Sequence, residues 1–339
     1  MTQQLKRNIT GDDLIFPNFD DIEVSTKTFT VNTNLNIDLE KLYNLLPITP
    51  YVVIVKKRGR KKKCDQTDPN KNLEYGAIIT VKYMEFMRGV EVAPKKNKGK
   101  PKKWFRNSIT VVIVFDKKIN MKVCMNGTFQ MTGCKTDEHA ELCVKHIWKY
   151  LEPNPCTYTF SRGTQLETLF IPSMRNIDFS VGFIIDREKL NKYMVTQKDF
   201  HCLLETSFGY TGVNIKVPLQ DDIRTMKIKK LIFSPNKEWI LEWVTFQQYL
   251  DILKPKDAIL KTNYQRYVTF LAFNSGCVIC SGLTADLMRN TYNFFVATIR
   301  KAYEHIEERL DPIISVKPKV IVDIVPKLAE LSLEELAIM

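Results

Sequence analysis

The sequence predicts an α+β fold built from two similar halves, each an antiparallel sheet with helices packed on one face. The first observation is a repeated marker. Asn126-Gly127 and Thr132-Gly133 in the first half correspond to Ser275-Gly276 and Ser281-Gly282 in the second, at a spacing of 149 residues. The second observation is that both halves begin with an alternating strand and a short helix, at nearly the same offset.

In the first half, residues 26–32 alternate between polar and apolar side chains and predict a half-buried strand. A short amphipathic helix is expected at 38–46, and apolar runs at 76–83, 108–115 and 119–125 predict three more strands. A long helix is expected from about 137 to 151, with Thr136 as its N-cap and Pro153 beyond its end.

The second half repeats this order. It predicts a strand at 176–183, a helix at 186–194, strands at 212–217, 223–233 and 267–274, and a long helix at about 285–310 that Pro312 ends. Residues 234–265 have no counterpart in the first half, and we expect a helix there at about 239–253. A further short amphipathic helix is expected at 326–339.

The net charge of +12 is concentrated in two segments. Residues 56–63 (KKRGRKKK) and 95–106 (KKNKGKPKKWFR) each hold seven basic residues and no acidic one, so the rest of the chain is close to neutral. Runs of like charge stay solvated and typically meet nucleic acid or another polyanion. A solubilising loop or a nuclear-import signal is the alternative.

The sequence does not support a catalytic site or a metal site. The sequence contains no GxxxxGK[ST], HExxH or GxSxG motif, so we expect neither an enzyme nor a cofactor. Cys277 and Cys280 form a single CxxC pair, but residues three apart on a strand point to opposite faces and no second pair lies nearby. His139 and His146 lie near one face of a helix without a third ligand, which favours packing over metal binding.

No apolar run approaches the roughly 18 residues of a membrane-spanning helix. The first residues, MTQQLKRNITGDDL, also lack the apolar core of a signal peptide. We therefore expect an intracellular protein whose cysteines are free thiols.

Three segments carry a resemblance to a known family. Residues 119–135 (INMKVCMNGTFQMTGCK), 270–282 (FLAFNSGCVICSG) and 28–39 (TFTVNTNLNIDL) resemble repeat segments of the TATA-box-binding protein family. The length of each half and the MTGCK variant resemble the diverged TATA-binding-protein-like proteins of large nucleocytoplasmic DNA viruses. The resemblance implies a saddle: a ten-stranded curved antiparallel sheet with four helices on its convex side and a concave face that enters the DNA minor groove.

The resemblance also implies the domain organisation. The chain divides into an N-terminal extension (1–21), a first saddle repeat (22–152), a second saddle repeat (171–311) and a C-terminal extension (312–339). The first repeat carries the basic insertion at about 56–106, and the second carries an insertion at about 219–266.

In the second half the resemblance places several residues on the DNA-binding face. The minor-groove contacts would be Asn176, Leu271, Ile279 and Ser281, and the two apolar wedges would be Phe273 and Tyr210. Phe270 and Phe273 must face opposite sides of one strand, and a one-residue bulge would exchange them.

The first half departs further from the family pattern. Thr132 keeps the central hydroxyl, but Thr26 replaces the asparagine and Cys124 replaces a wedge. Lys122 and Gln130 replace apolar contacts. The second wedge of this half could be Tyr75, Phe105 or Trp104. Phosphate contacts from the basic loops could compensate, and the candidates are Lys61, Lys62, Lys102, Lys103 and Arg106.

The resemblance implies a DNA-binding transcription-initiation factor that recruits a viral RNA polymerase apparatus. Its expected partners are A·T-rich double-stranded DNA and transcription factors or polymerase subunits, with no membrane and with homodimer formation as an option when DNA is absent. The nucleus or the cytoplasmic viral factory is its expected location, and packaging in virions is a further option. The alternatives are a protein-interaction scaffold that has lost minor-groove readout, and a polyanion binder that uses the loops alone.

Overall fold

The computed structural model describes residues 10–53, 69–91, 105–204, 212–262 and 264–308. Within these ranges the chain folds into a large antiparallel sheet with six α-helices, and the chain up to Glu307 forms one compact unit. The predicted α+β class is therefore confirmed. In the described part of the chain, no helix is both long and apolar enough to cross a membrane.

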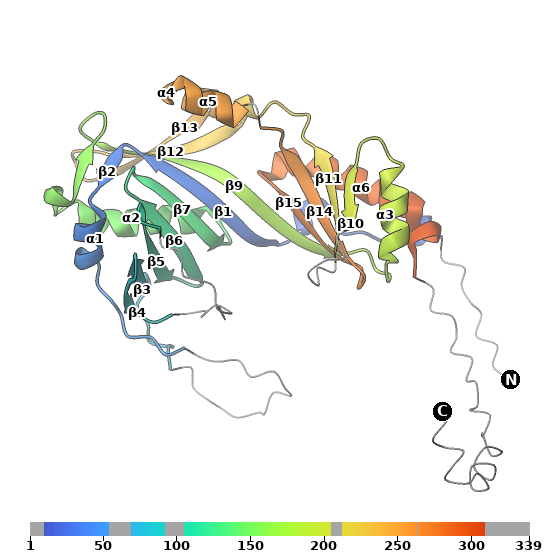
Figure 1. The fold of residues 1–339 in the computed structure, drawn as a ribbon, viewed down its shortest axis with the longest axis horizontal. Helices are drawn as coiled ribbons and strands as arrows, with labels where there is room; N and C mark the ends of the chain where they lie inside the picture. Colours follow the sequence, from blue (N-terminus) through green and yellow to red (C-terminus); the bar gives the residue numbers. More distant parts are fainter. Residues whose placement is uncertain (1–9, 54–68, 92–104, 205–211, 263, 309–339) are drawn as a thin grey trace, which may run out of the picture. The chain divides into compact units, whose positions relative to one another are not determined.

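Apart from the additional edge strand β4 of the first half, the two halves of the sheet have the same strand order, and β1 and β9 pair at the centre (Figure 1). The order is β10-β11-β14-β15-β9-β1-β7-β6-β5-β3-β4. The strands of the first half are β1 (Val24–Thr33), β3 (Ala77–Tyr83), β4 (Phe86–Gly89), β5 (Ser108–Val114), β6 (Lys118–Cys124) and β7 (Thr128–Cys134). Those of the second are β9 (Leu166–Ser180), β10 (His201–Leu204), β11 (Gly212–Pro218), β14 (Tyr267–Phe273) and β15 (Cys277–Gly282). The strands β2 (Leu35–Ile37) and β8 (Tyr158–Phe160) form a separate pair.

Four helices belong to the repeated halves and lie on one face of the sheet. They are α1 (Leu39–Leu45) and α2 (Asp137–Leu151) in the first half, and α3 (Arg187–Val195) and α6 (Ala285–Ile306) in the second. Each half has its own apolar core between its helices and its strands. The helices expected at 38–46, 137–151 and 186–194 are confirmed to within one residue, whereas α6 ends at Ile306 rather than at 310. The helix expected at 326–339 lies outside the described residues.

The repeated glycines occupy equivalent turns. Gly127 lies in the turn between β6 and β7, and Gly276 lies in the turn between β14 and β15, with φ angles of 70° and 80°. A Cβ atom on Gly127 would meet the Leu35 carbonyl oxygen at 2.2 Å, and one on Gly276 would meet the Phe183 carbonyl oxygen at 2.2 Å. Glycine is required at both positions because any side chain would strain the backbone and clash.

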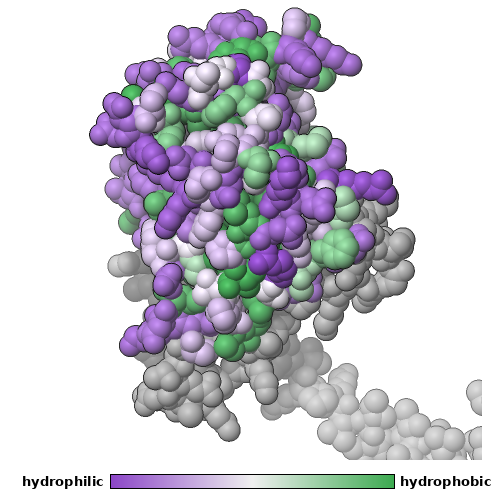
Figure 2. All heavy atoms as spheres, turned by 90° about the vertical axis from the view of Figure 1, so that its left-hand side faces the viewer, coloured by the Kyte–Doolittle hydropathy of each residue, from purple (hydrophilic) through white to green (hydrophobic). Residues whose placement is uncertain are grey.

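The short β4 forms the outer edge of the first half. It carries the exposed Phe86 and Met87, and Arg88 donates to the Tyr43 carbonyl oxygen at 2.6 Å. Figure 2 faces this end and shows hydrophobic residues as a narrow stripe between hydrophilic ones. A short edge bordered by charge disfavours pairing with other sheets.

Four 3₁₀ turns complete the described chain: η1 (Gly11–Asp13), η2 (Phe19–Asp21), η3 (Pro155–Thr157) and η5 (Ile223–Thr225). The turn η2 fixes the N-terminal segment against α6. Phe19 is buried in the second core, Tyr292 donates to the Pro17 carbonyl oxygen at 2.7 Å, and Arg289 pairs with Asp20 at 2.8 Å.

The insertion of the second half differs from its prediction. Residues 239–253 do not form one helix: β13 (Trp239–Thr245) pairs with β12 (Lys227–Phe233), and α4 (Phe246–Ile252) and α5 (Pro255–Thr262) follow. The strand expected at 223–233 begins only at Lys227, after η5, and β12 pairs with the first part of β9 rather than inside the second half. Pairing with β12 stabilises the extended conformation of residues 239–245.

Candidate nucleic-acid interface

The sheet face opposite α2 and α6 is continuous across the two halves, and we call it the open face. The core side chains of each strand point to the helices, so every second residue points the other way. Thr26 pairs with Asn176, which pairs with Ser281, and Thr28 pairs with Thr132. These pairs join the open faces of the two halves through the central strands.

In the second half the open face combines apolar and small polar side chains. Phe273 is half-buried on this face, while Phe270 is fully buried in the core. Leu271 pairs directly with Ile279 on β15. The resemblance-based candidates Asn176, Leu271, Phe273, Ile279 and Ser281 therefore share one face, with no bulge in the β14–β15 pairing to exchange the two phenylalanines.

In the first half the open face is polar. Thr132 and Gln130 are exposed on β7, and Lys122 pairs with Gln130 on β6. Cys124, at the end of β6, is half-buried, and burial raises the pKa of its thiol while the charge of Lys122 acts in the opposite sense. Cys124 is therefore a neutral group at physiological pH, although it is much smaller than the aromatic wedge that the resemblance leads us to expect.

The alternatives for the second wedge of the first half lie on different sides of the sheet. Phe105 lies over the open face, because the Lys122 ammonium is 4.5 Å from its ring centroid, and 71% of the residue is exposed. Tyr75 packs on Phe115 with 5.0 Å between ring centroids, and Phe115 contacts His146 of α2. Tyr75 therefore belongs to the helix-covered side. Trp104 lies outside the described residues.

The insertion of the second half covers part of the open face. Leu169 and Ile171 of β9 are buried against Phe246 and Tyr249 of α4, on the side opposite the first core. The Asn32 side chain of β1 donates to the Tyr249 hydroxyl at 2.6 Å. The open face is therefore sealed over the first part of β9 and accessible from about residue 173 onward.

Two cations that the sequence analysis missed border the second half of the open face. Lys216 and Arg266 line a pocket of about 250 Å³ together with Tyr264, Thr269 and Ser281. Nε of Arg266 is buried without a hydrogen-bond partner. The alternation of β11 could have revealed Lys216, whereas only the fold brings Arg266 from the insertion to this place.

The open face also carries an acidic side chain. Asp178 is exposed on β9 and pairs with Ile279 of β15. A carboxylate at this position disfavours contact with phosphates and narrows the region that can face a DNA backbone.

Of the remaining predicted residues, the structure describes two, and the others lie outside the described ranges. Thr26 is half-buried on β1, and its hydroxyl donates to the Cys134 carbonyl oxygen at 3.4 Å. Arg106 is exposed in the turn before β5. Tyr210, Lys61, Lys62, Lys102 and Lys103 lie outside the described residues.

The side chains of the CxxC pair point apart. Cys277 is exposed on the open face, and Cys280 is buried in the second core. Among the described residues, no group of three or more His, Cys, Asp or Glu side chains could hold a metal ion.

The chain has detectable similarity to known proteins. No protein-family model matches it. Uncharacterized protein 335L of Invertebrate iridescent virus 6 is 25% identical over 299 residues, which cover 85% of this chain and 86% of that protein. Among solved structures, Methanococcus jannaschii TBP aligns with a TM-score of 0.41 and 13% identity, over 84% of this chain and 99% of that one. Neither similarity assigns the chain to a family.

Proposed function

We propose that the protein binds double-stranded DNA through the open face and catalyses no reaction. The observation that supports this most directly is the composition of the face, where Asn176, Ser281 and Thr132 accompany the apolar Leu271 and Phe273. The minor groove of A·T pairs offers only acceptors and shape, so amide and hydroxyl donors and apolar wedges are the suitable groups. An A·T-rich duplex is the expected ligand.

The two halves would contribute different contacts. Phe273 inserts between bases from the second half, since it is the aromatic side chain at the accessible end of β14. Lys122 and Arg106 of the first half and Lys216 of the second contact phosphates, together with the basic segments 56–63 and 95–106. Each phosphate contact makes binding weaker as the salt concentration rises.

The biological setting that we propose is viral transcription initiation. The motif resemblance to the TATA-box-binding family and the similarity to an iridescent-virus protein both support it. In this setting the protein marks a promoter and recruits transcription factors or RNA polymerase subunits, in the nucleus or the cytoplasmic viral factory of an infected cell.

The test compares Phe273→Ala with Phe294→Ala on an A·T-rich duplex labelled at both ends for fluorescence energy transfer. Phe273 is already half-buried, so insertion buries only its remaining surface, and its loss should cost about 1 kcal/mol, or about fivefold in Kd. The bend of the duplex should decrease as well. Phe294 is an exposed aromatic residue on α6, on the helix-covered side, and its replacement should change neither quantity. Equal effects of the two substitutions would contradict the proposal.

A protein-interaction scaffold is the second candidate, and Asp178 is the observation that favours it. A carboxylate on the open face suits a protein partner better than a phosphate backbone. If the face binds protein, Asp178→Asn should leave DNA affinity unchanged. If the face binds DNA, the same substitution should strengthen binding, because it removes a repulsive charge.

A further inference from the structure

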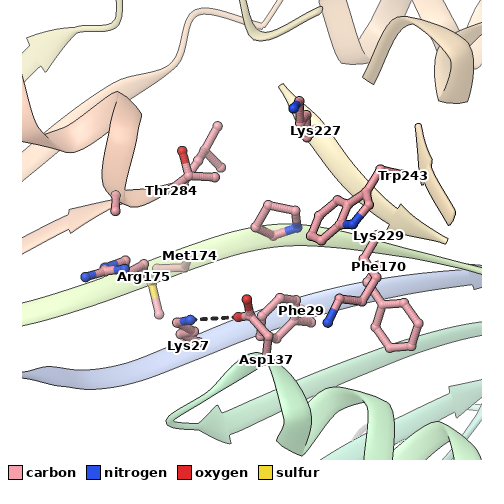
Figure 3. A pocket seen from close by; sticks show the side chains of 13 residues that line it. Lys27, Phe29, Asp137, Phe170, Met174, Arg175, Lys227, Lys229, Trp243 and Thr284 are labelled. Carbon is pink, nitrogen blue, oxygen red and sulfur yellow. Dashed lines mark hydrogen bonds and ion pairs between the residues drawn. The ribbon is translucent and has the colours of Figure 1, made fainter. Parts of the chain in front are cut away.

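A pocket lies at the outer edge of β9, between the two parts of the sheet that this strand joins. The strand β15 pairs with residues 175–180 of β9, and β12 pairs with residues 166–170, so the edge between them is free. The pocket there has a volume of about 230 Å³. Its apolar lining consists of Phe29, Phe170, Pro172, Met174, Trp243 and Leu283 (Figure 3).

Four cationic side chains surround this apolar lining: Lys27, Arg175, Lys227 and Lys229 (Figure 3). Lys27 pairs with Asp137 at 2.7 Å. The pocket is lined by the start of α6 as well, where Thr284 caps the helix, so the positive end of that helix dipole also faces it.

The positive charge is only partly compensated. Lys229 forms an ion pair with Glu141 of α2. Lys227 is exposed and has no ion-pair partner in the described ranges, and Nε of Arg175 is buried without a hydrogen-bond partner. Asp137 is the acidic residue of the lining, and Lys27 already neutralises it. The pocket therefore combines an apolar interior with an excess of positive charge.

Exposed apolar side chains of β13 continue the surface next to the pocket. The strand β12 lies between β9 and β13, so within the described residues the unpaired edge of β13 faces away from the pocket. Trp243 and Leu241 of β13 point to the pocket side and are 58% and 51% exposed. Exposed apolar side chains gathered next to a pocket are typical of a protein-binding surface.

We propose that this pocket is the docking site for an acidic segment of a protein partner, which places one large apolar side chain in the pocket. The carboxylates of the segment would pair with Lys227 and Arg175. A DNA backbone presents charge but no apolar group to fill the space between Trp243 and Phe170. A protein segment supplies charge and apolar surface together.

The proposal is separate from DNA binding by the open face. Lys27 and Phe29 point to the helix-covered side of β1, whereas Thr26 and Thr28 of the same strand point to the open face. Most of the pocket therefore lies on the side of the sheet away from a bound duplex, and only Met174 and Leu283 line both this pocket and the one on the open face. The result of the peptide-binding experiment does not depend on whether the open face binds DNA.

The experiment uses random peptides displayed on phage and selected on the full-length protein. Peptides that also bind the variant Lys227→Glu/Trp243→Ala are removed in each round. The survivors should be rich in Asp and Glu around a Trp, Phe or Leu. Synthetic copies should bind the variant at least about tenfold more weakly in fluorescence anisotropy, because one charge pair and one apolar contact are lost.

Two controls test whether the loss of peptide binding in the double variant arises at the pocket. Lys198→Glu changes the same charge on the exposed turn between α3 and β10 and should leave peptide binding unchanged. Thermal unfolding should show that the double variant remains folded, since Lys227 and Trp243 are both exposed. An A·T-rich duplex should not displace the peptide.

Three results would overturn the proposal. The selection could enrich no peptide that prefers the unmodified protein, or the enriched peptides could lack acidic residues. The duplex could also displace the peptide stoichiometrically, in which case the peptide would be acting as a substitute for DNA on the basic segments.

Discussion

Alkylation of Cys277 tests directly whether DNA covers the open face. The thiol is exposed on β15, in the row that also holds Ile279 and Ser281. Cys280 on the same strand is buried on the opposite side, and burial raises the pKa of its thiol. Cys156 is exposed beside α1 on the helix-covered side, where its carbonyl oxygen accepts from Lys41 at 3.0 Å. The chain thus contains an open-face thiol, a buried thiol and an exposed control.

The expected decrease in the alkylation rate at Cys277 follows from mass action. The thiolate is the reactive species, so exposure and pKa together set the rate of reaction with iodoacetamide. If a bound duplex covers Cys277, only the free protein reacts there, and the rate falls by the factor 1 + [DNA]/Kd. At a duplex concentration ten times Kd, this is about an elevenfold decrease. The rate at Cys156 should not change, and peptide mass spectrometry measures both cysteines in one sample.

An unchanged rate at Cys277 under saturating duplex would refute the assignment of the open face. DNA would then be bound by the basic segments alone, and raising the salt concentration should abolish that binding. An equal decrease at Cys156 would instead indicate that the duplex coats the whole protein. Because no residue is replaced, neither result can be attributed to misfolding.

Two further predictions concern stability. Burial, together with the charge of Lys149, lowers the pKa of His146. The unfolded chain therefore binds more protons there than the folded chain, so stability should fall as the pH drops through about 6.5 toward the folded pKa. In urea unfolding, His146→Gln should lose less stability than the unmodified protein between about pH 7.5 and pH 5.5; a pH dependence as steep as before would contradict this. Tyr249→Phe should lower the free energy of unfolding by about 1 kcal/mol, because the partly buried Asn32 amide loses its 2.6 Å acceptor. An unchanged free energy of unfolding in urea would mean that a water molecule replaces the hydroxyl as the acceptor of the Asn32 amide.

The repeat made most of the fold predictable. Gly127 and Gly276 mark the same turn in both halves, and each is followed by a strand and a long helix. Because side chains alternate along a strand, fixing these two turns also fixes which residues face the helices. The positions of Phe270 and Phe273 on opposite faces follow from this alternation.

The insertion was not predictable in the same way. Residues 239–245 (WILEWVT) are apolar on both faces, so their pattern does not distinguish a strand from a helix. Their partner β12 comes from the same insertion, and its pairing with β9 depends on the completed sheet. The capping box of Thr245 and Gln248 was a usable signal, because it marks the true start of α4.

A site that is built from many elements could not be predicted from the sequence either. The pocket beside β9 combines residues of β1, β9, β12, β13, α2 and α6. No spacing along the chain relates Lys27 to Lys227 or to Thr284. Their proximity arises only because β9 joins both halves and the insertion at its edge, which places separate segments around one space.

The chemical difference between the halves has a consequence for how DNA could lie on the open face. A duplex backbone has approximate two-fold symmetry, so a face with two equal halves would bind it equally well in either direction. Here the first half offers Lys122, Gln130 and Thr132, and the second offers Leu271 and Phe273. The second half therefore suits base steps that unstack easily, and the first suits phosphates and polar groove edges. A site with such a step at one end would fix the direction of the protein, which is what a factor needs in order to direct a polymerase to one side of its binding site.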